Sequence, residues 1–350
     1  MTTSSENGTA SVENPSAVST QIHLVSRPTG WPTEENFRAV RVGLPGLEPG
    51  QVRVANTFIS VDPYMRGRMN DVKSYVPPFA VGEVMTGGAV GEVIASTADE
   101  LPVGTTVLHQ QGWRDVAQGD AAGFTAVTPV PGVPTSAFLG VLGMTGLTAW
   151  VGLTTIAGIR PGDTVFVSGA AGAVGSVVGQ IARQLGATRV IGSAGSAEKV
   201  HLLTERYGFD AAFNYKDAPV REQLPAHAPD GIDVYFDNVG GDHLEAALDL
   251  MNRDGRVALC GAISQYNTTG TTPGPDNMAN LVKQGLTLRG FTVGFHLDQA
   301  ATYREAMGPW LRDGDVVTDE TVIDGIENAV DGFLAMMRGK NVGKMVIRTR

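Results

Sequence analysis

A glycine-rich turn between a predicted strand and a predicted helix constrains the fold of this chain most strongly. The stretch Val165-Phe-Val-Ser-Gly-Ala-Ala-Gly-Ala-Val-Gly-Ser-Val-Val-Gly179 begins with strand formers and ends in an apolar helical pattern. Its glycines allow a tight turn and a close approach to the backbone. A helix that starts there offers free N–H groups and positive partial charge to the phosphates of a nucleotide. The alternative interpretation is a packing turn without a ligand.

Strand and helix patterns alternate around this turn from about residue 138 to residue 317. Strands are expected at 164–168, 189–193, 234–237, 256–260 and 287–291, and helices at 174–185, 197–207, 243–250 and 276–284. Nearly continuous apolar strands indicate burial on both faces, which is typical of a parallel sheet. The pattern therefore predicts an α/β fold, with a doubly wound parallel sheet in a Rossmann domain at 141–317.

The segments on either side of this domain predict a second one. Short alternating strands at 51–59, 88–94 and 106–108 are separated by glycine and proline, which indicates a small barrel or sandwich. A final helix at 325–338 and a strand at 344–348 lack a partner of their own. They are expected to return to the N-terminal domain, which would then comprise residues 21–140 and 318–350. Residues 1–20 are polar and are expected to form a disordered tail.

One uncharged stretch requires a choice between a membrane span and a buried helix. Residues 124–159 contain no charged residue, but glycines and threonines interrupt the apolar run from 138 to 159. A membrane-spanning helix needs about 20 mainly apolar residues. We therefore expect a buried helix between the domains and no membrane partner.

Charge and cysteine content exclude several classes of site. The 350 residues carry a net charge of −10, which argues against a nucleic-acid or anionic-membrane partner. Cys260 is the only cysteine, and the six histidines show no paired spacing, so neither a disulfide nor a thiolate-rich zinc site is expected. No metal is predicted. A single thiol fits a reducing compartment, and the expected location is cytoplasmic.

The segment after the next strand predicts which nucleotide is bound. An acid that holds a ribose 2′-OH is expected about 20 residues beyond the glycines, but Ala194 and Gly195 occupy that place. Lys199 follows and offers a positive charge to a 2′-phosphate. The pattern favours NADP(H) over NAD, although Lys199 could be a solvated helix lysine. The expected contacts in these two segments are Ala170, Gly172, Ala173, Val174, Gly175, Gly195 and Lys199.

Several further motifs carry a resemblance to a known family. They are Val61-Asp-Pro-Tyr-Met-Arg-Gly-Arg-Met69, Gly143-Met-Thr-Gly-Leu-Thr-Ala-Trp150, Ser168-Gly-Ala-Ala-Gly-Ala-Val-Gly-Ser176, Asp237-Asn-Val-Gly-Gly241, Leu259-Cys-Gly-Ala-Ile-Ser-Gln-Tyr-Asn267 and Asn341-Val-Gly-Lys344. From about Gln21 to Arg348 the chain resembles the zinc-independent medium-chain dehydrogenase/reductases. The most similar branch contains leukotriene B4 12-hydroxydehydrogenase/prostaglandin reductase, alkenal double-bond reductases and curcumin reductase.

The resemblance implies a GroES-like β-barrel catalytic domain, a Rossmann domain and a cleft between them. It also implies NADPH-dependent reduction of the double bond of enones and enals by a monomer or homodimer. Zinc-dependent relatives have a Gly-His-Glu ligand motif where this chain has Gly82-Glu-Val84. The cofactor contacts implied by matching motifs are Met144, Thr148, Lys199, Tyr215, Asn238, Cys260, Ser264, Tyr266, Phe291, Val293 and Asn341.

Enone reduction also needs a group that stabilises the developing enolate. An aligned hydroxyl would serve, and the candidates are Tyr266, beyond a strand end, and Tyr64, in a turn expected to face the cleft. Either tyrosine could instead be a packed aromatic residue, and the ribose 2′-OH or water could donate the proton. Asp62 is expected to be a turn residue. Arg66 and Arg68 are expected to be a solvated pair, and the alternative is that they steer an anionic group of the substrate.

Three functions are compatible with these patterns. The first is an NADPH-dependent enone or enal reductase. The second is another oxidoreductase, above all a quinone reductase that uses the same cofactor. The third is a non-enzymatic NADPH-binding protein.

Overall fold

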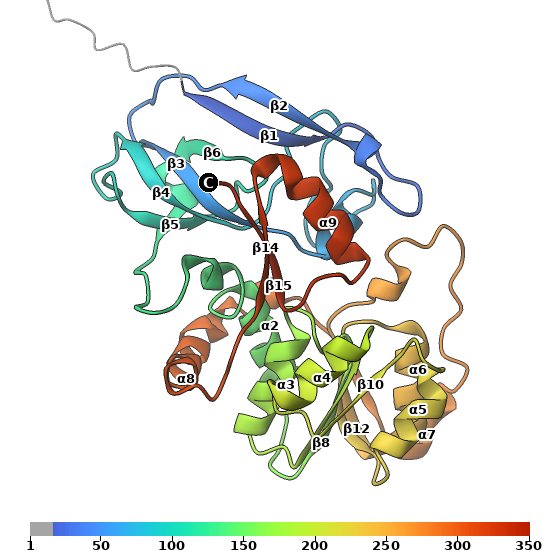
Figure 1. Ribbon diagram of the computed structural model, residues 1–350. Helices are drawn as coiled ribbons and strands as arrows, with labels where there is room; N and C mark the ends of the chain where they lie inside the picture. The colour runs from blue at the N-terminus through green and yellow to red at the C-terminus, as the bar shows by residue number, and fades with distance from the viewer. Residues whose placement is uncertain (1–16) are drawn as a thin grey trace, which may run out of the picture.

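A six-stranded parallel sheet organises one half of the molecule, the lower half in Figure 1. The computed structural model describes residues 17–350. The strands lie in the order β10-β9-β8-β11-β12-β13, which is the 3-2-1-4-5-6 order of a dinucleotide-binding sheet. Their bounds are β8 Thr164–Val167, β9 Arg189–Ala194, β10 Ala211–Asn214, β11 Ile232–Asp237, β12 Met251–Leu259 and β13 Thr287–Gly290. The strand order reverses between β8 and β11, which opens a crevice at their carboxyl ends.

Helices cover this sheet because its central strands are apolar on both faces. Val165, Phe166 and Val167 of β8 are fully buried. A Cβ at Gly179 would overlap the ring of Phe209, so α3 carries a glycine where it packs closely. The helices of this half are α2 Met144–Val151, α3 Gly175–Gln184, α4 Ala197–Glu205, α5 Val220–His227, α6 Gly241–Leu250, α7 Ala279–Gln284 and α8 Ala300–Asp313.

Mainly antiparallel strands form the other half, at the top of Figure 1. A seven-stranded sheet has the order β14-β15-β3-β4-β5-β7, and β6 also pairs with β3. A separate hairpin of β1 and β2 lies above it (Figure 1). The elements are β1 Val18–Leu24, β2 Phe37–Gly43, β3 Gln51–Ser60, α1 Tyr64–Arg68, β4 Ala89–Ser96, β5 Thr106–His109, β6 Val116–Asp120, β7 Phe124–Ala126, β14 Glu320–Asp324, α9 Ala329–Met337 and β15 Lys344–Arg348.

The C-terminal segment belongs to this upper sheet. Strand β15 pairs antiparallel with β3, with Ile347 opposite Ile59, and parallel with β14. Helix α9 buries Phe333 beside Trp113, at a ring distance of 6.0 Å. The returning segment thus adds two strands to the sheet that β3 to β7 form, whereas the parallel sheet contains only β8 to β13.

The buried helix expected in the uncharged stretch is confirmed. Helix α2 is buried along nearly its whole length and continues as the π-helical turn Gly152–Ile156. Trp150 packs near the rings of Tyr303 and Trp310 of α8. No helix among residues 17–350 has the length and apolarity that crossing a membrane requires.

Several predicted boundaries are wrong. Strand β12 begins at Met251 rather than at residue 256, and helix α9 begins at Ala329 rather than at residue 325. Strand β1 begins at Val18 and pairs with β2, so residues 18–20 belong to a strand rather than to the predicted tail. The rest of that prediction, residues 1–16, lies outside the described residues. Helix α7 begins at Ala279 rather than at Asp276, whose backbone amide donates to the Glu245 side chain of α6.

Candidate functional site

The glycine turn joins β8 to α3 at the carboxyl edge of the parallel sheet. Gly169 has a φ of +59°, which favours glycine. A Cβ at Gly175 would overlap the carbonyl oxygen of Gly169, whereas a Cβ at Gly172 would meet only that oxygen, at 3.3 Å. Gly175 is therefore needed for packing, and Gly172 leaves the backbone open to a ligand. This cradle fits the pyrophosphate of a dinucleotide.

The predicted contacts in the turn differ in how far they are exposed to solvent. Gly172, Ala173 and Val174 are half-buried and form its outer surface. Ala170 is fully buried, and its amide donates to the carbonyl oxygen of Ser193 on β9 at 2.9 Å. Any contact from Ala170 to a ligand would therefore come from its backbone.

The C-terminal segment of the barrel half lies directly on this turn. The amide of Gly343 donates to the carbonyl oxygen of Ala171 at 2.9 Å, and Gly343 also bridges to Gly172. The side-chain amide of Asn341 donates to the carbonyl oxygen of Gly343 at 2.8 Å. Asn341, predicted as a late cofactor contact, thus lies close to the glycine turn.

Two lysines gather beyond the end of β9. The ammonium group of Lys199 donates to the carbonyl oxygen of Gly339 at 2.7 Å, and Ser196 caps α4 by accepting from the amide of Lys199 at 3.3 Å. Burial, and then the charge of Lys216, lower the pKa of Lys199. A bound anion would relieve that repulsion, which fits a 2′-phosphate. Sequence reasoning missed Lys216, although it directly follows the predicted contact Tyr215.

Tyr215 covers Gly195 at this end of the site. A Cβ at Gly195 would lie 2.9 Å from the Tyr215 hydroxyl, so only glycine leaves room for the ring. The amide of Tyr215 donates to the carbonyl oxygen of Ala194 at 3.1 Å. Tyr215 therefore packs on Gly195, and the next residue, Lys216, is close enough to Lys199 to repel its charge.

The end of β11 supplies a buried carboxylate at the middle of the sheet edge. One oxygen of Asp237 accepts from Tyr235 at 2.6 Å and from Ser168 at 3.0 Å, and also from the amides of Val239 and Gly240. Burial raises the pKa of this carboxyl group. This contact set fixes the turn after β11.

Asn238 and Ser264 are held in this turn by the backbone. The Asn238 side chain donates to the carbonyl oxygen of Ser168 at 2.8 Å. Ser264, a predicted contact, donates its hydroxyl to the carbonyl oxygen of Val239 at 2.6 Å. The amide of Cys260 donates to the carbonyl oxygen of Asp237, and burial raises the pKa of its thiol to about 12. At neutral pH the thiol is protonated.

The predicted contacts on α2 and after β13 form an adjoining apolar wall. The Thr148 hydroxyl donates to the carbonyl oxygen of Met144 at 2.7 Å, while the Met144 side chain is 42% exposed. Phe291 meets Phe236 edge to face at 6.3 Å. Val293 follows Phe291 and is half-buried against the same apolar core. A planar ring could pack against this wall.

Both predicted catalytic tyrosines reach the region between the two halves. Tyr64 lies on α1 of the barrel, and Tyr266 follows β12 of the parallel sheet, yet both pack against one apolar cluster. A Cβ at Gly261 would lie 3.2 Å from the Tyr266 hydroxyl. Burial raises the pKa of each phenol, so both are O–H donors at neutral pH.

A third tyrosine belongs to this group. Tyr75 is 55% exposed, and its pKa is raised by burial and by the neighbouring Cys260 thiol. The charges of Arg68 and Asp62 also act on it. Sequence reasoning missed Tyr75, because nothing in the neighbouring sequence distinguishes this tyrosine from an ordinary loop residue.

Asp62 and Arg66 are corrections to the sequence predictions. Asp62 is buried and pairs with the buried ammonium group of Lys344 at 3.1 Å, so it is more than a turn residue. Arg66 is buried rather than solvated, with 3% of its surface exposed. Its guanidinium donates to the carbonyl oxygen of Gly30 at 2.8 Å and to the Asn267 side chain at 3.0 Å.

Arg68 is likewise engaged rather than solvated. Its guanidinium lies 4.0 Å from the centre of the Phe79 ring and donates to the carbonyl oxygen of Pro77 at 3.0 Å. Together with Arg66, it fixes the surroundings of α1 and of Tyr64.

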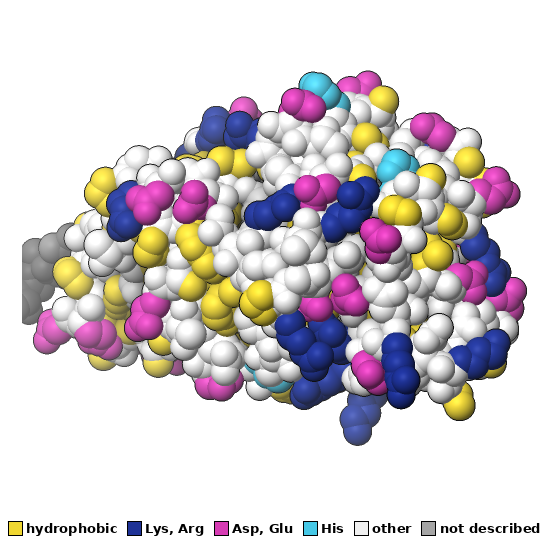
Figure 2. All heavy atoms as spheres, turned by 90° about the horizontal axis from the view of Figure 1, so that it is seen from below, with side chains coloured by type: hydrophobic (Ala, Val, Ile, Leu, Met, Phe, Trp, Pro, Cys, Tyr) yellow, Lys and Arg dark blue, Asp and Glu magenta, His cyan; other side chains and the backbone are white. Residues whose placement is uncertain are grey.

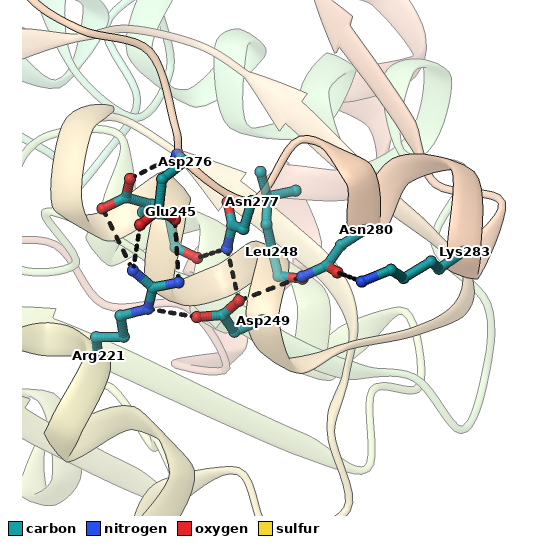
Figure 3. A network of polar contacts seen from close by, with 8 residues as sticks. All are labelled: Arg221, Glu245, Leu248, Asp249, Asp276, Asn277, Asn280 and Lys283. Carbon is teal, nitrogen blue, oxygen red and sulfur yellow. Dashed lines mark hydrogen bonds and ion pairs between the residues drawn. The ribbon is translucent and has the colours of Figure 1, made fainter.

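The loop after Tyr266 is anchored at its far end by Arg221 (Figure 3). The guanidinium pairs with Asp249 at 2.5 Å and with Asp276 at 3.1 Å, and these carboxylates raise the pKa of Arg221. Asn277 also donates to Asp249, at 2.7 Å. The end of the loop at 268–277 is therefore tied to α5 and α6.

One face of the molecule carries clustered charges of both signs. In the view of Figure 2, Lys and Arg side chains gather in the lower middle, with Asp and Glu side chains beside them. Within residues 17–350, no group of three or more His, Cys, Asp or Glu side chains could hold a metal ion.

Comparisons with known proteins agree with this architecture. A family model described as the N-terminal domain of oxidoreductase matches residues 20–127, and one described as zinc-binding dehydrogenase matches residues 173–311. NADPH-dependent curcumin reductase of Escherichia coli is 41% identical, over 93% of this chain and 95% of that protein. The NADP⁺-dependent 2-alkenal reductase of Nicotiana tabacum is 39% identical, over 93% and 96%.

A solved crystal structure of a related protein has the same fold. CurA of Vibrio vulnificus in complex with NADPH superposes with a TM-score of 0.90 at 42% identity, covering 95% of this chain and 99% of that one. Identity at this level, over nearly the full length, confirms the family expected from the motifs. The chain belongs to the medium-chain dehydrogenase/reductases, in the branch of NADP-dependent curcumin and alkenal reductases.

Proposed function

We propose that the protein reduces the carbon–carbon double bond of α,β-unsaturated ketones and aldehydes with NADPH. The observation that carries the proposal is the convergence of Tyr64 and Tyr266 on one apolar cluster from the two halves of the molecule. The names of the curcumin and alkenal reductases support the same substrate class.

The chain has the residues that NADPH would need. The cradle at Gly172 and the first turn of α3 would hold the pyrophosphate. Lys199, Lys216 and Tyr215 would hold the 2′-phosphate, and the wall at Thr148 and Phe291 would face the nicotinamide. When bound, the cofactor supplies the hydride for the β-carbon of the substrate.

The tyrosines would supply the electrostatic part of the reaction. Negative charge develops on the carbonyl oxygen as the enolate forms, and an aligned O–H donor stabilises it. Tyr64 and Tyr266 are half-buried and keep their protons at neutral pH, so each hydroxyl would donate a hydrogen bond to the enolate oxygen. The donor of the proton to the α-carbon would be one of these hydroxyls or water.

The substrate would be a small molecule with an apolar body. Tyr75 and the half-buried rings of Tyr64 and Tyr266 offer apolar faces with polar tips. The anchored loop at 268–277 would form one wall of the pocket. We propose a cytoplasmic monomer or homodimer as the working form.

A substrate panel separates this proposal from its alternatives. NADPH oxidation would be followed at pH 7 with enones, enals, quinones and saturated ketones, and the reduced bond would be identified in each product. Turnover of enones or enals to saturated carbonyl compounds supports the proposal. Turnover of quinones alone would favour the quinone reductase, and tight NADPH binding without turnover of any compound would favour the non-enzymatic protein.

A further inference from the structure

Arg66 is a buried cation that the proposed function leaves without a role. It lies in the middle of α1, the short helix that also carries Tyr64, and is 3% exposed. The hydrogen bonds of its guanidinium go to neutral oxygen atoms, which belong to the carbonyl groups of Pro28 and Gly30 and the side-chain amides of Asn70 and Asn267. A buried charge held by neutral groups costs more than an apolar side chain of similar size, so packing alone does not explain an arginine here.

One of these hydrogen bonds crosses between the two halves of the molecule. The Nε atom of Arg66 donates to the side-chain oxygen of Asn267 at 3.0 Å, and Asn267 directly follows Tyr266 in the loop after β12. Gly30 packs against the same loop, because a Cβ at Gly30 would lie 3.3 Å from the methyl group of Thr269. The barrel residues around Arg66 thus contact the loop that carries Tyr266.

Tyr266 lies between two anchored neighbours. On its N-terminal side, the Ser264 hydroxyl donates to the carbonyl oxygen of Val239 at 2.6 Å, which ties the loop to the turn after β11. On its C-terminal side, Asn267 is held by Arg66. Because Arg66 belongs to the helix of Tyr64, its hydrogen bond to Asn267 connects the two segments that carry the tyrosines.

We propose that Arg66 and Asn267 are positioning residues, which hold the Tyr266 hydroxyl in place relative to Tyr64 for hydrogen bonding to the enolate oxygen. The inference rests on the proposed function, because it deepens the role given there to the two tyrosines. A hydroxyl stabilises the developing charge only from hydrogen-bond distance, and a displacement of about 1 Å can reduce the rate by about 10²-fold. Neither Arg66 nor Asn267 needs to touch the substrate.

The test is a double-mutant cycle of Asn267→Ala and Tyr266→Phe, measured as kcat for an enone at saturating NADPH. Asn267→Ala removes the acceptor and leaves the arginine in place. With Tyr266 present, we expect this substitution to lower kcat roughly 10- to 100-fold and to leave the Kd of NADPH nearly unchanged. In the Tyr266→Phe background it should cause little further loss, because the hydroxyl that it displaces is already absent.

Two further variants separate positioning from a general loss of stability, and thermal unfolding would be recorded for all of them. Asn267→Asp keeps an acceptor oxygen for Arg66 and should restore most of kcat. Asn70→Ala removes another amide acceptor of the same guanidinium, at 2.8 Å, but within the barrel half, and should leave kcat nearly unchanged. Losses that multiply in the double variant would overturn the proposal, as would an equal loss of kcat in Asn70→Ala or no recovery in Asn267→Asp.

The wild-type protein and the Tyr266→Phe variant distinguish this inference from the proposed function. If the wild type turns over neither enones nor enals, the proposed function fails and the inference fails with it. If the wild type reduces enones but Asn267→Ala keeps its kcat, only the inference fails. If Tyr266→Phe alone keeps its kcat, Arg66 has no donor to position, and the inference is likewise overturned.

Discussion

At the residue scale, the site is a small set of side chains with unusual surroundings. Lys199 and Lys216 repel each other beyond the end of β9, and two half-buried tyrosines keep their protons. The sequence singled out Lys199, Tyr64 and Tyr266 as site candidates because strand ends and turns can be recognised from neighbouring residues. The burial of Arg66 and Asp62 could not be predicted, since their partners Asn267 and Lys344 lie about 200 and 280 residues away.

Removal of the Lys199 charge should affect NADPH far more than NADH. The Lys199→Ala substitution deletes a charged donor to the 2′-phosphate, a contact of about 1.5–3 kcal/mol. We expect the Kd of NADPH to rise about 10- to 100-fold and that of NADH to change little. Fluorescence titration measures both, and Lys283→Ala, on an exposed part of α7, is a matched control. Equal losses for the two cofactors would contradict the role of Lys199.

Removal of one tyrosine hydroxyl should slow turnover and leave cofactor binding largely intact. Tyr266→Phe and Tyr64→Phe each delete one donor, and loss of one aligned donor typically reduces the rate by roughly 10²–10³. Stopped-flow or steady-state measurement of kcat, with the Kd of NADPH as a control, tests this expectation. If neither variant loses tenfold in kcat, the proposed donors are wrong.

At the element scale, the glycine turn and its strand were predictable, whereas several peripheral elements were not. Strand β8 and helix α3 stand out because an apolar run, small residues and a helical pattern follow one another. The β1–β2 hairpin was missed because its strands mix polar and apolar residues and are joined by a long connection. Helix α8 contains Pro309, which normally argues against a helix interior.

Substitution of two glycines of the turn by alanine should affect stability in one case and NADPH binding in the other. Gly175→Ala places a methyl group against the carbonyl oxygen of Gly169, so we expect the free energy of unfolding to fall by about 1–3 kcal/mol. Gly172→Ala meets much less crowding and should fold normally, but it should weaken NADPH binding. Urea unfolding without ligand and cofactor titration separate the two effects. The reverse pattern would show that the roles of these glycines are misassigned.

At the scale of the whole molecule, the C-terminal segment holds the two halves together. It contributes β14 and β15 to the barrel sheet, while Gly343 and Gly339 contact the nucleotide-binding half. The buried pair of Lys344 and Asp62 lies where this segment meets the turn before α1. The domain that supplies Tyr64 is thereby fixed next to the domain that supplies the cofactor cradle.

Breaking this pair should destabilise the protein strongly. Lys344→Met leaves the Asp62 carboxylate buried without its partner, a change that typically costs about 3–5 kcal/mol. The double variant with Asp62→Asn removes the stranded charge and should recover much of the loss. Urea unfolding of the two single variants and the double variant measures the coupling. Additive effects of the two substitutions would mean that the pair does not act as a unit.

The route of the hydride tests the whole account most directly. NADPH deuterated at nicotinamide C4 would be incubated with the protein and an enone, and the product would be analysed by NMR and mass spectrometry. We predict a saturated ketone with deuterium on the former β-carbon and an unlabelled carbonyl carbon. An allylic alcohol with deuterium on the carbonyl carbon would contradict carbon–carbon double-bond reduction.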